Sequence, residues 1–224
     1  MRLRSWRQGR GIVASEMNGL TTEHIEQLWS LLSSRDAALH QQGRELLASL
    51  ERRQVRRLLS GRDLRSHAQP DLSGLPLHAA VLTQARLHQF NFTHAELRHA
   101  QLERAFLTEV DFSVADLRQA VFHRSRLLRC RLVRARLNGA DFTRARLSGC
   151  DLASASLRSA RFGKAQLSEC SLQGADLGGA HLQHARLRGV DLRGADLRNA
   201  HLPTTRSGMI VDDTTRWPDV GPTA

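Results

Sequence analysis

The three cysteines of the chain, Cys130, Cys150 and Cys170, recur at one constant interval. Thiolates bind zinc or form disulfides, so the spacing raises both kinds of chemistry. A zinc site, however, needs ligands that converge as a tetrahedron, and a linear stack of inward thiols does not offer that geometry. Each cysteine also stands where alanine stands in neighbouring segments. We therefore interpret the cysteines as small apolar core side chains.

Histidines and carboxylates supply the other candidates for chemistry. His181 and His201 are separated by the same interval as the cysteines, with His184 nearby, but they do not form a closed set of metal ligands. Most aspartates come directly before a leucine or phenylalanine, which favours a structural role at a turn over paired acid–base catalysis. These are Asp111, Asp141, Asp151, Asp176, Asp191 and Asp196. Nucleotide-binding loops, GxSxG and HExxH are all absent, so we expect no enzyme, no cofactor and no metal.

An internal repeat organises more than half of the chain. Every fifth residue from Leu72 to Leu202 is leucine or phenylalanine, over 27 consecutive positions, and a second, mostly small series stands two residues earlier. A period of five fits neither the 3.6 of a helix nor the 2.0 of a strand. It fits a chain that turns a corner every five residues and points one large and one small side chain inward on each side. Four such sides close one coil, and stacked coils should pair as a parallel ladder about 4.8 Å apart.

The register predicts which side chains stack inside the coils. Residues one coil apart, at i and i+20, should lie one above another, which predicts one interior column of aromatic rings and one of thiols. The first is Phe122, Phe142 and Phe162, and the second is Cys130, Cys150 and Cys170. The register also runs through the arginine-rich segment HRSRLLRCRLVRARL, residues 123–137. Leu127, Leu132 and Leu137 should therefore be buried there, with the arginines outside.

This repeat resembles the pentapeptide-repeat family, whose units read A(D/N)LXX. The likeness is clearest in GADLGGAHLQHARLRGVDLRGADLRNAHL and covers residues 70 to 203. The resemblance implies an all-β solenoid, namely a right-handed quadrilateral parallel β-helix. The repeat count gives about seven coils.

The flanks of the repeat predict the domain organisation. We expect a basic leader over residues 1–19, an α-helical hairpin cap over 20–65, the β-helix over 66–203, and a C-terminal cap and tail over 204–224. Both ends of such a ladder need covering, because unpaired edges invite aggregation.

Both caps have candidate apolar residues. Helical spacing places Ile25, Leu28 and Leu32 on one helix face, and a second group of leucines lies on a further helix face. The apolar surface of this helical hairpin should cover the first coil. The second group is Leu39, Leu46, Leu47, Leu50 and Leu58. The C-terminal plug should contain Met209, Ile210, Val211 and Trp217. Many members of the family end in a similar Thr-x-Trp-Pro segment.

The composition limits which cellular environment and which partners we expect for the protein. With 33 Lys+Arg against 22 Asp+Glu, the formal charge is +11, which permits an anionic partner. An odd cysteine count, the lack of an apolar secretory segment and the lack of a run of about 18 apolar residues predict a soluble cytoplasmic protein that does not enter a membrane.

Steps of one coil place basic residues in two neighbouring columns. The first contains Arg104, Arg124, Arg144 and Lys164, followed by His184; the second contains Arg86, Arg126, Arg146 and Arg186, interrupted by Phe106 and Gln166. We call six of these residues the basic corner and predict that they contact an anionic partner. They are Arg104, Arg124, Arg126, Arg144, Arg146 and Lys164. The alternative is a solvated surface on which Asp141 and Glu103 pair with the arginines.

Three functions remain open. The first is a rigid binding scaffold for another protein. The second, implied by the resemblance, is protection of a type II topoisomerase such as DNA gyrase by imitation of duplex DNA, which a basic surface disfavours. The third is binding of nucleic acid or another polyanion along the basic corner, through phosphates, because Phe106 is the only outward aromatic of the repeat. A homodimer through a terminal cap is a further expectation.

Overall fold

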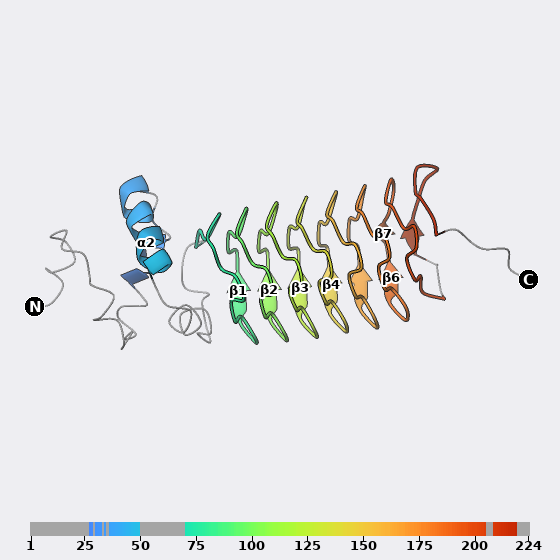
Figure 1. Ribbon diagram of the computed structural model, residues 1–224, viewed down its shortest axis with the longest axis horizontal. Coiled ribbons are helices and arrows are strands. Elements are labelled where there is room, and N and C mark those ends of the chain that lie inside the picture. The colour runs from blue at the N-terminus through green and yellow to red at the C-terminus, as the bar shows by residue number, and fades with distance from the viewer. Residues whose placement is uncertain are drawn as a thin grey trace, which may run out of the picture.

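The repeat folds into a straight rod with one short strand per coil along one side (Figure 1). The computed structural model describes residues 27, 28, 30–32, 34, 36–49, 70–204 and 208–218. The predicted leader, Ile25, Leu50, Leu58 and the side chain of Leu47 lie outside the described residues.

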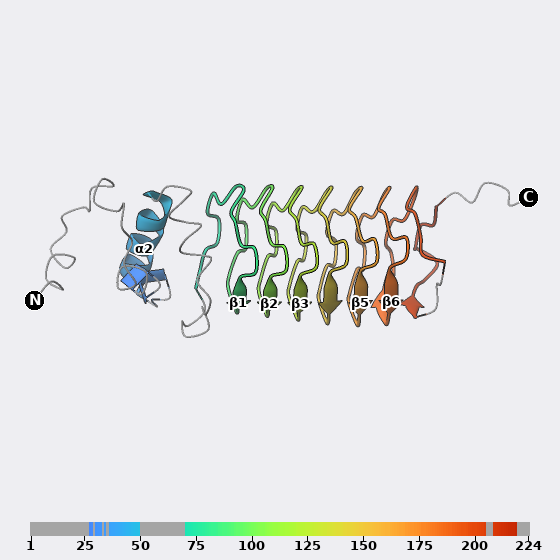
Figure 2. The same ribbon diagram turned by 90° about the horizontal axis from the view of Figure 1, so that it is seen from below.

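Six strands form one parallel sheet, and each pairs with the strand one coil away. They are β1 (Arg86–His88), β2 (Phe106–Thr108), β3 (Arg126–Leu128), β4 (Arg146–Ser148), β5 (Gln166–Ser168) and β6 (Arg186–Arg188). Leu87 pairs with Leu107 and Leu107 with Leu127, so each step across the sheet equals four five-residue repeats, as expected. Figure 2 shows the row of strands from below. The predicted parallel β-solenoid is confirmed. The six strands of this sheet mark about six turns. The sequence predicted about seven coils, and the difference comes from the sides at the two ends of the repeat, which add no strand to the sheet.

Tight turns make the corners. From Gly74 to Asn199 every fifth residue has a positive φ. At three corners of each coil the amide after this residue donates to a carbonyl three residues earlier, as Ala100 does to Leu97 over 3.1 Å. A positive φ at the third residue and this hydrogen bond define a type II turn. The aspartates have the structural role expected at these turns, since each carboxylate accepts the amide two residues on. Asp111, Asp141, Asp151, Asp176, Asp191 and Asp196 all do so.

The interior is apolar and stacked. Leu127, Leu132 and Leu137 are no more than 2% exposed, so the arginine-rich segment belongs to the ordered rod. Rings of the Phe122, Phe142 and Phe162 column lie nearly parallel, with centroids 4.6 Å and 5.0 Å apart. Burying each such side chain contributes about 1.5–3 kcal/mol before chain entropy is subtracted.

The cysteine column also lies in this interior. The Cys130 thiol donates to the Leu107 carbonyl at 3.4 Å, and the Cys150 thiol donates to the Leu127 carbonyl at 3.5 Å. A hydrogen bond with Cys130 and burial raise the pKa of Cys150 to about 12, so this thiol stays protonated at neutral pH. Buried, protonated thiols behave as small apolar groups with weak donors.

Helical residues lie at the N-terminal end of the rod, beside the first coil (Figure 1). Residues 27–28 and 30–32 are helical, and helix α2 spans Ala37–Ser49. Leu28 and Leu32 belong to the buried core, and the Leu32 carbonyl accepts the Asp71 amide at 3.3 Å. Leu39 was expected on the buried face but is 45% exposed. The close approach of the helical segments is at Gly43 instead, where a Cβ would lie 2.8 Å from the Leu31 Cβ.

The C-terminal segment continues the ladder after a local slip. Strand β7 (Val190–Asp191) pairs in parallel with β8 (Met209–Ile210). The sequence distance between these two strands is one residue shorter than a full coil. The full spacing returns further along, where Asp196 bridges Arg216 of the next coil. Trp217, one full coil after Leu197, packs against the core.

Two expected members of the C-terminal plug are on the surface instead. Ile210 is 49% and Val211 is 42% exposed, because only the Met209 side of β8 faces the previous coil. Dimerisation through this end stays a prediction. No described helix is long and apolar enough to cross a membrane.

Candidate functional site

The six residues of the basic corner are exposed and form two adjacent columns. Arg126 and Arg146 begin β3 and β4 and are direct partners in the sheet. The other column occupies successive turns, with φ of 57° at Arg124 and 59° at Arg144. Between the columns runs a line of small residues, such as Ser125, that are buried in the rod. The inward residue forces its two neighbours outward, so the coils that contain Arg124 with Arg126 and Arg144 with Arg146 each present two basic groups side by side.

Opposite charges do not neutralise this corner. Within the described part of the chain, none of its six residues forms an ion pair. The two carboxylates that could have paired with it are engaged elsewhere: Asp141 accepts the Thr143 amide at 2.8 Å, and Glu103 accepts the Thr83 hydroxyl at 3.0 Å. The alternative of local pairing by Asp141 and Glu103 is therefore not what the structure contains. Like charges about 5 Å apart repel, which leaves the corner suited to anionic groups.

An aromatic ring lies within the strand column. Phe106 is 41% exposed, with the Arg86 guanidinium carbon 5.5 Å and the Arg126 guanidinium carbon 5.3 Å from its ring centroid. These are cation–π distances. Arg86 and Arg126 lie one coil before and one coil after Phe106, so the ring separates two cations of the same column.

A second apolar side chain lies next to Phe106 on the sheet. Leu128 is 41% exposed, because β3 points Arg126 and Leu128 outward and Leu127 inward. Thr108 of the Phe106 strand is its direct partner. Such diagonal neighbours are about 7–8 Å apart, within reach of an aromatic side chain. The outer surface of the sheet thus combines arginines with a small apolar pair.

The strand column ends in a cavity near the C-terminal end of the rod. The cavity has a volume of about 590 Å³, and its lining includes His184, Arg186, Arg188 and Pro203. Its two arginines, Arg186 and Arg188, extend the cationic surface past the basic corner.

Another side of the same coils has a different charge arrangement. We call it the paired face: the carboxylates of Glu96, Asp116, Asp176 and Asp196 with the side chains His78, Arg98, Arg118, Arg136, Arg158, Arg198 and Arg216. Asp116 has three partners, with distances of 2.7 Å to Arg98, 2.8 Å to Arg118 and 3.6 Å to Arg136.

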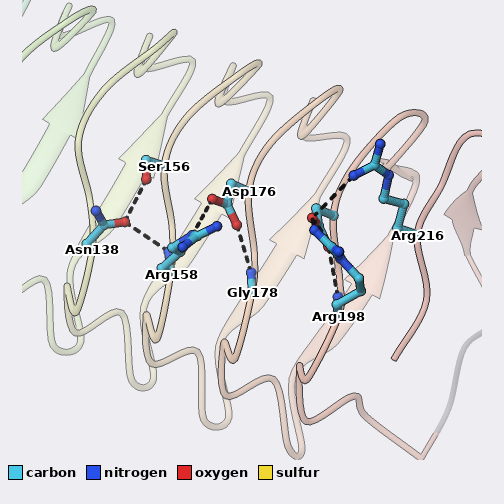
Figure 3. Close-up of polar contacts among 8 residues, drawn as sticks. Asn138, Ser156, Arg158, Asp176, Gly178, Arg198 and Arg216 are labelled. Carbon is cyan, nitrogen blue, oxygen red and sulfur yellow. Dashed lines mark hydrogen bonds and ion pairs between the residues drawn. The ribbon is translucent and has the colours of Figure 1, made fainter. Parts of the chain in front are cut away.

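Part of this network is visible in Figure 3, where Arg158 and Gly178 both contact Asp176. Burial would raise the pKa of Asp116, but the hydrogen bonds from Arg118 and Arg98 outweigh it and hold this pKa well below its usual range. The Arg198 hydrogen bond lowers the pKa of Asp196 to about 2. Arg98, Arg118 and Arg198 therefore keep Asp116 and Asp196 ionised at neutral pH.

The histidines stack as the register predicts. The His181 and His201 rings are 4.9 Å apart and nearly parallel. His181 also lines a shallow cavity of about 520 Å³ with Arg161 and Gln183. No cluster of three or more potential metal ligands occurs among the described residues.

Comparison with known proteins places the chain in a family. The model for the pentapeptide repeat region matches residues 120–197, and the model for pentapeptide repeats, in 8 copies, matches residues 77–113, which together make up just over half of the chain. The chain belongs to the pentapeptide repeat proteins. No curated protein matches the sequence.

Solved structures of the same class resemble the chain. HetL, from the cyanobacterium Nostoc and involved in regulating heterocyst differentiation, is 28% identical, with 65% of this chain and 84% of HetL covered and a TM-score of 0.39. A pentapeptide repeat protein of the Arabidopsis thaliana thylakoid lumen is 26% identical, with coverage of 48% and 68% and a TM-score of 0.32. The plasmid-mediated fluoroquinolone resistance protein QnrB1 is 20% identical, with coverage of 61% and 81% and a TM-score of 0.32.

Proposed function

We propose that this chain is a non-enzymatic binding rod that holds an anionic macromolecular partner along the basic corner. The observation that supports this function is the contrast between two surfaces of one rod. Each arginine of the paired face forms an ion pair, whereas the six residues of the basic corner have none within the described residues.

The rod suits binding rather than chemistry. Aspartates such as Asp111 accept turn amides, Asp116 pairs with arginines, the thiols are buried, and His181 stacks on His201. The corner residues stand on a regular ladder, so binding has to order only their side chains and not the backbone that carries them.

Nucleic acid is the second candidate, because unpaired arginines also suit phosphates. Imitation of duplex DNA has less support, since that function needs free carboxylates and those of the paired face are already bound by arginines. Purified gyrase checks it directly: a supercoiling assay in which this chain changes neither activity nor inhibitor sensitivity eliminates topoisomerase protection.

The test of the proposed function compares three immobilised proteins incubated with extract of the source cells. They are the unmodified chain, the variant Arg124→Glu/Arg144→Glu and the control Arg134→Glu/Arg161→Glu. Both variants change the net charge equally, and all four residues are exposed and without an ion pair among the described residues. We expect the same retained partner on the unmodified and control proteins and its loss from the corner variant. Equal retention by all three would contradict the proposed function.

A further inference from the structure

The partner that fits the basic corner is defined by spacing, shape and an apolar contact. We infer that it is an acidic amphipathic α-helix that lies along the rod, with a carboxylate stripe over the basic corner and an apolar side chain against Phe106 and Leu128. This inference rests on the proposed function and names the partner's chemistry.

The first argument is the spacing of the cations along the rod. Neighbouring coils are about 4.8 Å apart, as in any parallel ladder, and the stacked rings of Phe122 and Phe142 are 4.6 Å apart. One turn of an α-helix advances about 5.4 Å, so carboxylates at i, i+4, i+7 and i+11 repeat at nearly the coil spacing. From Arg104 to Lys164 there are three coil steps, over which the two repeats drift apart by only about 2 Å. Long arginine side chains absorb that difference.

Other anionic chains match the columns less well. Side chains on one face of an extended strand repeat every 6.6–6.8 Å or so, which puts the fourth carboxylate about 6 Å out of step. Phosphates of one B-DNA strand advance about 3.4 Å each and wind around the duplex axis about every 10 base pairs. A straight column of cations therefore meets only a few consecutive phosphates. The helix is the closest geometric match.

The second argument is the apolar pair at the centre of the surface. Proteins that bind single-stranded nucleic acid stack bases on exposed aromatic rings. The Phe106 ring already has the Arg86 and Arg126 guanidinium groups at 5.5 Å and 5.3 Å from its centroid, so a base would have to displace a guanidinium group to stack on the ring. Phe106 and Leu128 are nevertheless each 41% exposed, which leaves surface for an apolar side chain of a partner. Arginine around an apolar centre is the composition of protein interfaces.

The surface also has the width and length of one helix. A helix with its side chains is about 10–12 Å across, enough to cover both columns of each coil. From Arg86 to Arg186 there are five coil steps, about 24 Å, which corresponds to roughly 16 helical residues. The carboxylate stripe would lie on the turn side, and the apolar residue toward Leu128.

Synthetic peptides of roughly 18 residues, long enough as helices to span both columns, provide the probes. The stripe peptide has glutamates at i, i+4, i+7 and i+11 and one leucine beside the middle of the stripe. A scrambled peptide has the same composition with the glutamates distributed around the helix, and a third peptide has prolines at two central positions to prevent helix formation. A single-stranded oligonucleotide and a duplex complete the set. Titration calorimetry and circular dichroism, at physiological salt where remote charges are screened, measure affinity and helix formation.

We expect the stripe peptide to gain helicity on binding and to bind at least about tenfold more tightly than the scrambled and proline peptides, a difference of about 1.4 kcal/mol. Arg124→Glu/Arg144→Glu should abolish this binding, and Arg134→Glu/Arg161→Glu should change it less than about threefold. Both corner positions should accept glutamate, because Glu109 and Glu169 adopt the same kind of positive φ, 55° and 52°, at another corner of the coil.

The apolar contact is tested by a double-mutant cycle. Phe106→Ala should weaken the stripe peptide about fivefold but should not affect a version in which its leucine is alanine. Equal affinity for the stripe and scrambled peptides would overturn the helix inference. It would also be overturned if either oligonucleotide bound more tightly than the stripe peptide and Phe106→Ala had no effect on peptide binding. The extract experiment would still stand in that case, since it depends only on the corner charges.

Discussion

The paired face and the basic corner stand on the same buried repeat, yet only the arginines of the paired face contact carboxylates. On the paired face Asp116 contacts three arginines, and Asp196 contacts Arg198 and Arg216. On the basic corner arginines are stacked coil after coil without a carboxylate in either column. Both surfaces are built from outward positions of the same five-residue repeat, and both columns continue from coil to coil. The difference lies in which side chains occupy those positions.

The difference separates a structural surface from a binding surface. Ion pairs that are partly buried and share hydrogen bonds hold adjacent coils together. Stacked like charges do the opposite and reduce stability, which is typical of surfaces kept for a partner. The following changes test this contrast, from the largest expected effect to the smallest.

The largest loss of stability should come from the interior that supports both surfaces. Ala140 is fully buried, and Ala140→Leu should lower the free energy of unfolding by about 3 kcal/mol, because a larger side chain forces the facing walls apart. Arg134→Ala, a change on the outer surface, should stay within about 0.5 kcal/mol. Urea denaturation measures both. The reverse order would discredit the assignment of inward and outward positions.

The next effect concerns the paired face. Asp116→Asn should lower the free energy of unfolding by about 2 kcal/mol, since three arginines lose their charged partner. Asparagine keeps the turn, because Asn91 accepts the Thr93 amide at 3.0 Å in the equivalent position. The matched change on the basic corner, Arg124→Ala, should not destabilise the rod. If both variants lose the same stability, the two surfaces do not differ as described.

Acid should weaken the paired face and leave the corner unchanged. The pKa of Asp116 is held below its usual range by Arg118 and Arg98, and that of Asp196 by Arg198. Carboxylates with a lowered folded pKa stabilise above their unfolded pKa, about 3.9, and this contribution is lost as the pH falls toward the folded value. Unfolding in urea should therefore become easier below about pH 4, by less than the Asp116→Asn effect. The Asp116→Asn variant should show a flatter profile over the same range.

The smallest effect is a gain of stability. Arg124→Glu places a carboxylate beside Arg104, Arg126 and Arg144 and should raise the free energy of unfolding by about 0.5 kcal/mol at low salt. The gain should disappear at about 1 M salt, where charges are screened within about 3 Å. Arg134→Glu, which has the same backbone conformation but Val114 and Ser154 as column neighbours, should show no gain. A stabilisation of equal size in both variants would mean that repulsion is not specific to the corner.

Much of the rod was predictable because its period is so regular. An uninterrupted series of apolar residues from Leu72 to Leu202 allows one register only, and that register places Leu127 inside and Arg126 outside. The pairing of the paired face was not predicted. Its signal in the sequence is the Asp-Leu-Arg at residues 116–118 and 196–198, in which the carboxylate and the guanidinium flank one inward leucine.

The two ends were less predictable, because there the period is broken. Trp217 lies in step with Leu197, but the slip between β7 and β8 hides this relation in the sequence. The exposure of Leu39, Ile210 and Val211 depends on whether another part of the chain reaches them, which local periodicity does not specify.

The sequence by itself determined the class of fold, the inward column of large side chains and the columns of charge on the surface, because side-chain spacing alone fixes which residues point inward in a coil of constant length. Only the tertiary structure decided which of those charges are neutralised. Asp116 reaches Arg98, Arg118 and Arg136 from three different coils, whereas Asp141 and Glu103 turn to Thr143 and Thr83 and leave the corner cationic. The choice depends on side-chain distances between coils, which a linear pattern does not contain.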